Sequence, residues 1–184
     1  MQKVTPETND IRIYQKLGRV DVKSLEVVDQ LLLILPAKPT KRDFMGLPQG
    51  AKLQAVFRKQ PAESTPAFVT RMGNTRQTLV VAGTLAADSS AFEQLTLGRK
   101  LVAAATAEKA GSLGICAVGF EDDVRERIVG NMLAAALAAA FKLPAYKSKA
   151  APDRIRNVRL LGLDERLDTS RVEAEAKGNN LARW

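Results

Sequence analysis

The sequence contains no histidine and a single cysteine, and these absences exclude several kinds of chemistry. Without histidine the chain cannot form a Ser-His-Asp triad, a Cys-His nucleophile pair or a zinc site with histidine ligands. With one cysteine it has no internal disulfide, no CxxC redox pair and no cysteine-rich metal cluster. Any chemistry of this chain therefore depends on lysine, arginine, serine, threonine, tyrosine or carboxylate side chains.

Long apolar segments are also missing. The longest apolar run, residues 132–141, is about ten residues long, whereas a membrane-spanning helix needs about 20. The N-terminal residues, MQKVTP, lack the apolar stretch of a signal peptide. Together with the lone Cys116, these features predict a cytoplasmic protein that does not contact a membrane. The length of 184 residues is enough for one domain with a full hydrophobic core.

The alternation of apolar runs with helix start and stop patterns predicts an α/β fold. Strands are expected at residues 11–14, 31–35, 67–70, 79–85, 112–120 and 158–163, and helices at residues 48–59, 90–110, 121–143 and 170–184. Residues 36–42, rich in proline and lysine, are expected to form a loop. Alternating strands and helices favour a mixed, mostly parallel sheet sandwiched by helices. Gly73-Asn74 predicts a turn that adds an antiparallel hairpin.

The helix ends carry their own patterns. Ser90 with Glu93 and Ser170 with Glu173 fit the S-x-x-E capping box, in which each side chain satisfies a backbone N–H at a helix start. Gly111 predicts the end of the helix over residues 90–110, because glycine adopts the left-handed conformation that often follows a last turn.

Positive charge is concentrated in one stretch. The chain has 28 Lys+Arg and 20 Asp+Glu, a formal charge of +8, and residues 147–159 contribute 5 − 1 = +4 of it. The five cations are Lys147, Lys149, Arg154, Arg156 and Arg159, against Asp153 alone. They are the candidate residues for nucleic-acid binding. The alternative is a solvated charged face, since the stretch has no interleaved aromatic residues on which bases could stack.

Other candidate sites are weaker. The sequence has no G-x-x-x-x-G-K-[ST] motif and no G-x-G-x-x-G motif after a strand. Glu121, Asp122 and Asp123 follow the strand at residues 112–120, and we interpret them as acidic residues at a helix start rather than a metal cluster, because consecutive residues there point in different directions. Cys116, in the middle of that strand, is expected to be buried and inert. No pair of carboxylates has a spacing that suggests acid–base catalysis.

Three segments carry a resemblance to a known family. Residues 134–149 (AAALAAAFKLPAYKSK) form an alanine-rich helix that runs into an aromatic-x-x-x-x-Tyr-Lys-Ser-Lys tail, residues 158–162 (VRLLG) form the strand after it, and residues 175–184 (EAKGNNLARW) contain Asn-Leu-Ala-Arg. In this order and spacing they resemble the N-terminal domain of the leucine aminopeptidase (cytosol aminopeptidase) family. The resemblance extends from about residue 77 to residue 184.

The resemblance implies a fold and a role. Residues 1–168 would form a macro-like N-terminal domain, and residues 169–184 would begin the helix that leads to a catalytic domain. In that family the catalytic domain binds two divalent metals, zinc or manganese, and assembles as a homo-hexamer. Its Asn-Thr-Asp-Ala-Glu-Gly-Arg motif, which carries metal ligands, is absent here. No catalytic, cofactor or metal position therefore transfers to this chain, which we expect to be inactive alone and to be a piece of a longer metallo-aminopeptidase.

Two other functions remain open from the sequence. One is a nucleic-acid-binding module that uses residues 147–159. The other is a ligand-binding module of the macro type that recognises ADP-ribose, which the fold permits but does not establish. The partners expected for the main hypothesis are the catalytic domain of the same protein and, through it, five further copies. The isolated chain is expected to be a monomer or a weak dimer.

Overall fold

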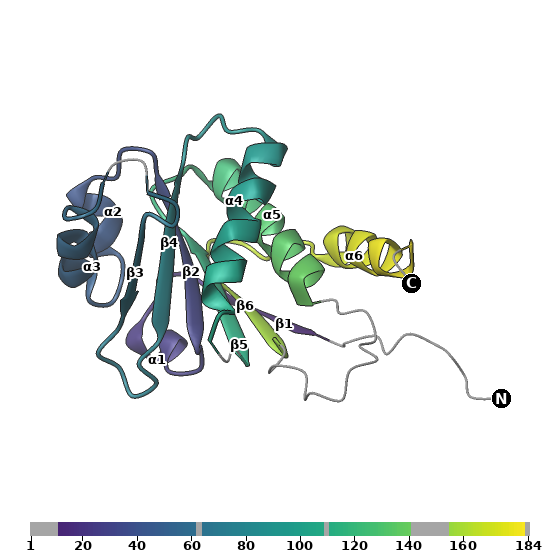
Figure 1. The fold of residues 1–184 in the computed structure, drawn as a ribbon, viewed down its shortest axis with the longest axis horizontal. Helices are drawn as coiled ribbons and strands as arrows, with labels where there is room; N and C mark the ends of the chain where they lie inside the picture. The colour runs from purple at the N-terminus through teal and green to yellow at the C-terminus, as the bar shows by residue number, and fades with distance from the viewer. Residues whose placement is uncertain (1–10, 62–63, 109–110, 141–154, 183–184) are drawn as a thin grey trace.

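The computed structural model describes residues 11–61, 64–108, 111–140 and 155–182 (Figure 1). It shows an α/β fold built on a six-stranded sheet with the strand order β1-β6-β5-β2-β4-β3. All neighbouring strands in this sheet run parallel except β3 and β4. The fold class expected from the sequence, a mixed and mostly parallel sheet with one hairpin, is confirmed.

The strands agree with the predicted segments. They are β1 (Arg12–Leu17), β2 (Gln30–Pro36), β3 (Phe68–Arg71), β4 (Leu79–Leu85), β5 (Ser112–Ala117) and β6 (Asn157–Leu163). The predicted hairpin joins β3 to β4, and the Asn74 side chain closes its turn by accepting a hydrogen bond from the backbone N–H of Thr78 at 2.9 Å. Strand β5 ends at Ala117, earlier than expected, before Gly119 adopts a positive φ of 78°.

The helices connect these strands along the chain. They are α1 (Val22–Leu25), α2 (Lys41–Met45), α3 (Gly50–Phe57), α4 (Ala91–Ala105), α5 (Asp122–Ala140) and α6 (Ser170–Ala182). Helix α5 begins with Asp122 and Asp123 in its first turn, as expected for acidic residues at the positive end of a helix dipole.

Both faces of the sheet are covered, which explains the near-continuous apolar runs of its central strands. In β2 the side chains alternate between two cores: Leu32 and Ile34 belong to one, and Leu31, Leu33 and Leu35 to the other. On the first face α4 and α5 pack over the sheet (Figure 1). On the second face Leu25 of α1, Phe44 of α2 and Leu53 of α3 complete the core.

The second face is covered unevenly. Helices α2 and α3 stand beside β3 and β4, at the opposite end of the sheet from β1 (Figure 1). At the β1 end, Tyr14 is 40% exposed although it lies in the middle of a strand. The sheet therefore keeps an open area on this face, over β1 and β6.

Helices α4 and α5 lie in close contact, as the alanine-rich sequence of α5 predicts. A Cβ atom on Gly98 of α4 would lie only 2.8 Å from the Cβ of Ala135 and 3.2 Å from the sulfur of Met132. Only a residue without a side chain allows this approach.

Two predicted helix ends are wrong. Helix α4 stops at Ala105, before Gly111, with Thr106 as its C-cap, and the hydroxyl of Thr106 donates to the carbonyl of Val102 at 2.8 Å. Ser170 does not cap α6 but is its first residue, and its N–H donates to the side chain of Asp168 at 3.0 Å. Thr169 directly precedes the helix, and its hydroxyl donates to the side chain of Glu173 at 2.6 Å.

Two short helices were not expected. Helix α2 begins inside the predicted loop over residues 36–42, because Asp43 accepts hydrogen bonds from the backbone N–H of Thr40 at 2.6 Å and from its hydroxyl at 2.9 Å. Helix α1 forms in the same way, with Asp21 and Ser24 making a capping box. By contrast, the predicted capping box of Ser90 and Glu93 at the start of α4 is confirmed.

Candidate functional site

The structure describes two of the five predicted nucleic-acid-binding residues. Lys147, Lys149 and Arg154 lie outside the described residues. Arg156 is exposed just before β6, where its backbone N–H donates to the carbonyl of Gly111 at 2.9 Å. Arg159 lies within β6 and is partly buried. The prediction that these five cations form one nucleic-acid-binding surface therefore stays a prediction.

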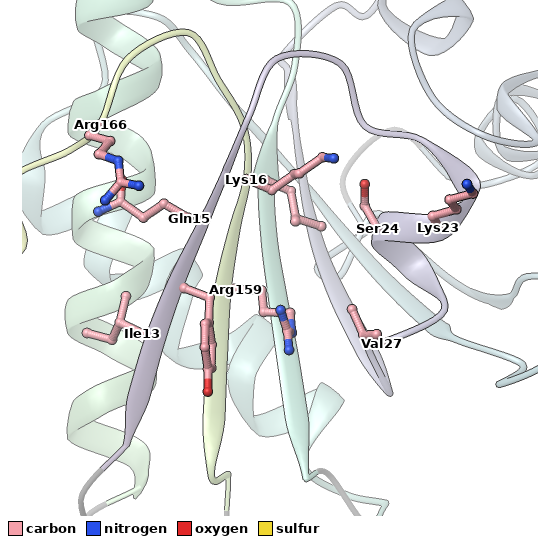
Figure 2. A pocket seen from close by; sticks show the side chains of 10 residues that line it. Ile13, Gln15, Lys16, Lys23, Ser24, Val27, Arg159 and Arg166 are labelled. Atoms are coloured by element: carbon pink, nitrogen blue, oxygen red, sulfur yellow. The ribbon is translucent and has the colours of Figure 1, made fainter.

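Arg159 belongs instead to a pocket on the open area of the sheet. The pocket has a volume of about 500 Å³ and lies between β1, β6 and the segment around α1 (Figure 2). Its lining consists of Ile13, Tyr14, Gln15, Lys16, Lys23, Ser24, Val27, Arg159, Leu161 and Arg166. Four of these residues are cationic and none is acidic, so the pocket is electropositive. We refer to it below as the β1–α1 pocket.

The positions of the cations differ within the pocket. Figure 2 shows Lys16, Lys23 and Arg159 around the space between β1 and α1. Arg166 lies on the other side of β1, near Gln15. The side chain of Gln15 is fixed there, because its amide donates to the carbonyl of Leu167 at 2.8 Å and accepts from the N–H of Leu167 at the same distance.

Arg159 is held by an aromatic ring. Its guanidinium carbon lies 4.5 Å from the centroid of the Tyr14 ring, within the range of a cation–π interaction. Within the part of the chain that the structure describes, its buried Nε atom has no hydrogen-bond partner and no carboxylate forms an ion pair with it. The strand thus presents a positive charge beside the pocket that none of the described carboxylates pairs with.

One carboxylate lies close to the rim. Asp21 is 4.0 Å from the amine of Lys16, at the limit of an ion pair. Hydrogen bonds from the side chain and backbone of Ser24, with the nearby charge of Lys16, lower the pKa of Asp21. Asp21 is therefore ionised at neutral pH, but it is already engaged in capping α1. It neutralises at most one of the pocket's cations.

The other candidate groups have structural roles. Arg125 contacts both Asp122 and Asp164 and donates to the carbonyl of Phe120 at 3.0 Å, so the acidic start of α5 is tied to the loop after β6. Cys116 is fully buried, and desolvation raises the pKa of its thiol to about 12. The expectation of a buried cysteine is confirmed. Among the described residues, no group of three or more His, Cys, Asp or Glu side chains could hold a metal ion.

The sequence did not point to the β1–α1 pocket. Tyr14, Lys16 and Lys23 were not among its candidate residues, and Arg159 was grouped with residues near it in the chain. The pattern that could have indicated it is the alternation in β1, where Tyr14 and Lys16 fall on one face of a strand whose other face is partly buried.

No helix among those described is long and apolar enough to cross a membrane.

Comparison with known proteins gives a structural relative but no sequence relative. No family model matches the chain, and no curated protein matches it. Among solved structures, 72 chains match. One of them, a mutant of tomato leucine aminopeptidase, superposes with a TM-score of 0.65 at 14% sequence identity. The match covers 98% of this chain but 37% of the tomato protein, so the fold described here corresponds to about a third of that enzyme chain.

Proposed function

We propose that this chain is a non-catalytic N-terminal domain of an enzyme related to leucine aminopeptidase. The observation that carries the proposal is the shared fold, which takes in nearly the whole of this chain and a minor part of the tomato enzyme. Such coverage is what one domain of a longer protein gives. The parent enzyme would remove N-terminal amino acids from peptides, and residues 1–168 and 169–184 would be its N-terminal domain and the start of its connecting helix.

The segments with family-like sequence support the same proposal. Their described residues fall on α5, β6 and α6, which follow one another in the order of elements. These elements also share one core: Ala136 of α5 and Val158 of β6 are fully buried in it, and Val172 and Ala176 of α6 pack against it. A resemblance that follows a packed unit is more informative than one spread over unconnected loops.

In this proposal the domain contributes to assembly, to substrate access or to partner contacts. Two divalent metals, zinc or manganese, and the reacting groups belong to the catalytic domain. The parent enzyme would be a cytoplasmic homo-hexamer held together mainly through its catalytic domains. No observation on the described residues favours the alternative of an ADP-ribose-binding module.

The test begins with the gene. Translation of the open reading frame beyond residue 184 should reveal a motif similar to Asn-Thr-Asp-Ala-Glu-Gly-Arg. The full-length protein should hydrolyse a chromogenic leucine anilide in the presence of manganese or zinc, whereas the 184-residue chain should not. A reading frame without such a motif, or hydrolysis by the chain alone, contradicts the proposal.

Assembly provides a second check. Light scattering should give a hexamer for the full-length protein and a monomer or weak dimer for this chain, because the main interfaces would lie in the catalytic domain. A stable hexamer of the chain alone would contradict the proposal that the main interfaces lie in the catalytic domain.

A further inference from the structure

The β1–α1 pocket has the features of a binding site that an accessory role in an aminopeptidase does not require. It is concave, with a volume of about 500 Å³. A volume of this size falls within the range of pockets that hold small organic molecules. Its origin is the uneven cover of the sheet, since α2 and α3 stand over the far end and leave β1 and β6 open (Figure 1).

The described residues offer the cations of the pocket little negative charge. Arg159 and Lys23 have no ion pair with any of the described carboxylates, and Lys16 has only the 4.0 Å contact with Asp21. Three like charges around one cavity repel one another, and the buried Nε of Arg159 has no acceptor among the described residues. Because an unpaired charge in a partly desolvated place is costly, an anion bound beside the partly buried Arg159 would stabilise this arginine.

Part of the remaining surface of the pocket is apolar. Tyr14 and Val27, which both line it, are 40% and 41% exposed and so can contact a ligand. Leu161 of β6 also lines the pocket and is buried in the second core. An inorganic ion alone would leave this apolar area in water, so a ligand with both a charged and an apolar part uses the pocket more completely.

We infer that the β1–α1 pocket binds a small organic phosphate monoester, with its phosphate among Lys16, Lys23 and Arg159 and its apolar part against Tyr14 and Val27. A phosphate dianion can accept hydrogen bonds from several cations at once, and the planar guanidinium of arginine suits its geometry. A second copy of this chain is a poor occupant, because it carries the same +8 charge. The inference goes beyond the proposed function and does not rest on it.

The experiment is a binding titration of the full 184-residue chain, followed by two-dimensional NMR of its backbone amides. Three probes separate the contributions: phenyl phosphate carries charge and ring, inorganic phosphate carries charge alone, and phenol carries the ring alone. Phenyl phosphate should bind most tightly. Its chemical-shift changes should centre on Tyr14, Lys16, Lys23, Val27 and Arg159.

Matched variants locate the site. Arg159→Gln and Lys23→Gln should each lower the affinity for phenyl phosphate by about fivefold or more, since a charge-assisted hydrogen bond to the anion is lost. Arg99→Gln and Lys100→Gln remove the same charges from exposed positions on α4, across the sheet, and should leave the affinity unchanged. Circular dichroism checks that each variant is folded. If Arg159→Gln does not fold, the comparison of Lys23→Gln with Lys100→Gln, both at exposed positions, shows whether the pocket binds phenyl phosphate.

Three results would overturn the inference. The first is an absence of shifts at the pocket with phenyl phosphate at millimolar concentration. The second is equal affinity in the pocket variants and the α4 variants. The third result is obtained with a single-stranded oligonucleotide. If it displaces phenyl phosphate, and if its binding falls as much with Arg156→Gln, outside the pocket, as with Arg159→Gln, the surface binds nucleic acid instead. None of these results depends on whether a catalytic domain follows.

Discussion

Tyr14 and Arg159 are direct neighbours across the ladder between β1 and β6, and the guanidinium carbon of Arg159 lies 4.5 Å from the centroid of the Tyr14 ring. Among the described strands, β1 is at the edge of the sheet and pairs only with β6. This cation–π contact therefore adds a side-chain link to a strand that has one backbone partner. It also fixes the orientation of the arginine beside the β1–α1 pocket.

Replacement of Tyr14 by leucine should lower the free energy of unfolding by about 0.5–1 kcal/mol, the usual value of an exposed cation–π contact. Urea unfolding followed by circular dichroism measures the change. Tyr14→Phe is the matched control, because it keeps the ring and removes only the hydroxyl. If both variants lose the same stability, the ring face contributes nothing and the contact is incidental.

The contact between α4 and α5 gives a second prediction. Gly98→Ala places a methyl group 2.8 Å from the Cβ of Ala135, which cannot rotate away, so the two helices must separate. Overpacking of this kind costs about 1–3 kcal/mol, more than the roughly 1 kcal/mol that alanine gains over glycine in a helix. The melting temperature of Gly98→Ala should therefore fall.

Gly178 of α6 supplies the control for that substitution. A Cβ there has no atom within 4 Å, so Gly178→Ala should show the helix preference of alanine without a clash. Its melting temperature should stay the same or rise slightly. An increase of stability in Gly98→Ala similar to that in Gly178→Ala would mean that α4 and α5 are not in close contact at Gly98.

Most of the fold could be predicted because buried strands and helices have recognisable patterns of apolar residues in the sequence. Strands β2 and β4 are covered on two faces, so residues 31–35 and 79–85 form near-continuous apolar runs that stand out from their surroundings. The start of α4 was equally clear, since Ser90 and Glu93 are the right types at the right spacing. These features depend only on residues near one another in the chain.

The errors arose where short-range patterns compete. Ser170 and Thr169 are both suitable helix caps three or four residues before Glu173, and the structure uses Thr169. Helices α1 and α2 have four and five residues, too few for the periodicity of a helix to show in the sequence. The residues that cap these two helices are common polar types, which the sequence alone does not distinguish from loop residues.

The β1–α1 pocket could not be predicted for a different reason. Arg159 meets Tyr14 because β1, at the beginning of the chain, pairs with β6, near its end. The sequence indicated a parallel sheet but not this strand order. Lys23 reaches the same cavity only because α1 forms where no helix was expected. A site assembled from distant segments becomes visible only once the topology is known.

Cys116 should be unreactive in the folded protein. It is fully buried, and a pKa of about 12 leaves its thiol protonated at neutral pH. Ellman's reagent at pH 8 should therefore react with it only after unfolding in denaturant, when the thiol becomes exposed with an ordinary pKa near 8.5. Rapid reaction of the native protein at that pH would contradict the burial of this side chain.

The same shift predicts a pH dependence. The folded state holds the Cys116 thiol neutral up to about pH 12, whereas the unfolded chain releases its proton from about pH 8.5. The pKa is raised on folding, so this contribution to stability is fully present below about pH 8.5 and is lost progressively as the pH rises toward 12. Cys116→Ala should lack this part of the alkaline dependence. Unfolding curves at pH 7.5 and 10.5 for both proteins measure the difference.

The nucleic-acid prediction for residues 147–159 can be tested by the dependence of binding on salt. Each phosphate contact that a basic residue makes contributes about 0.9 to the slope of log affinity against log salt concentration. Binding of a DNA duplex by the wild-type chain should therefore weaken steeply between about 50 and 200 mM salt. No binding at all, or binding that salt does not weaken, would remove this function.

A triple variant separates specific contacts from net charge. Lys147→Gln, Lys149→Gln and Arg154→Gln together should reduce the salt slope by about 2–3, because up to three phosphate contacts are lost. The control removes three exposed cations elsewhere, Arg58, Arg99 and Lys100, so that the net charge is the same in both proteins. If both variants lose affinity and slope equally, the chain attracts DNA only through its total charge, and residues 147–159 are a solvated face.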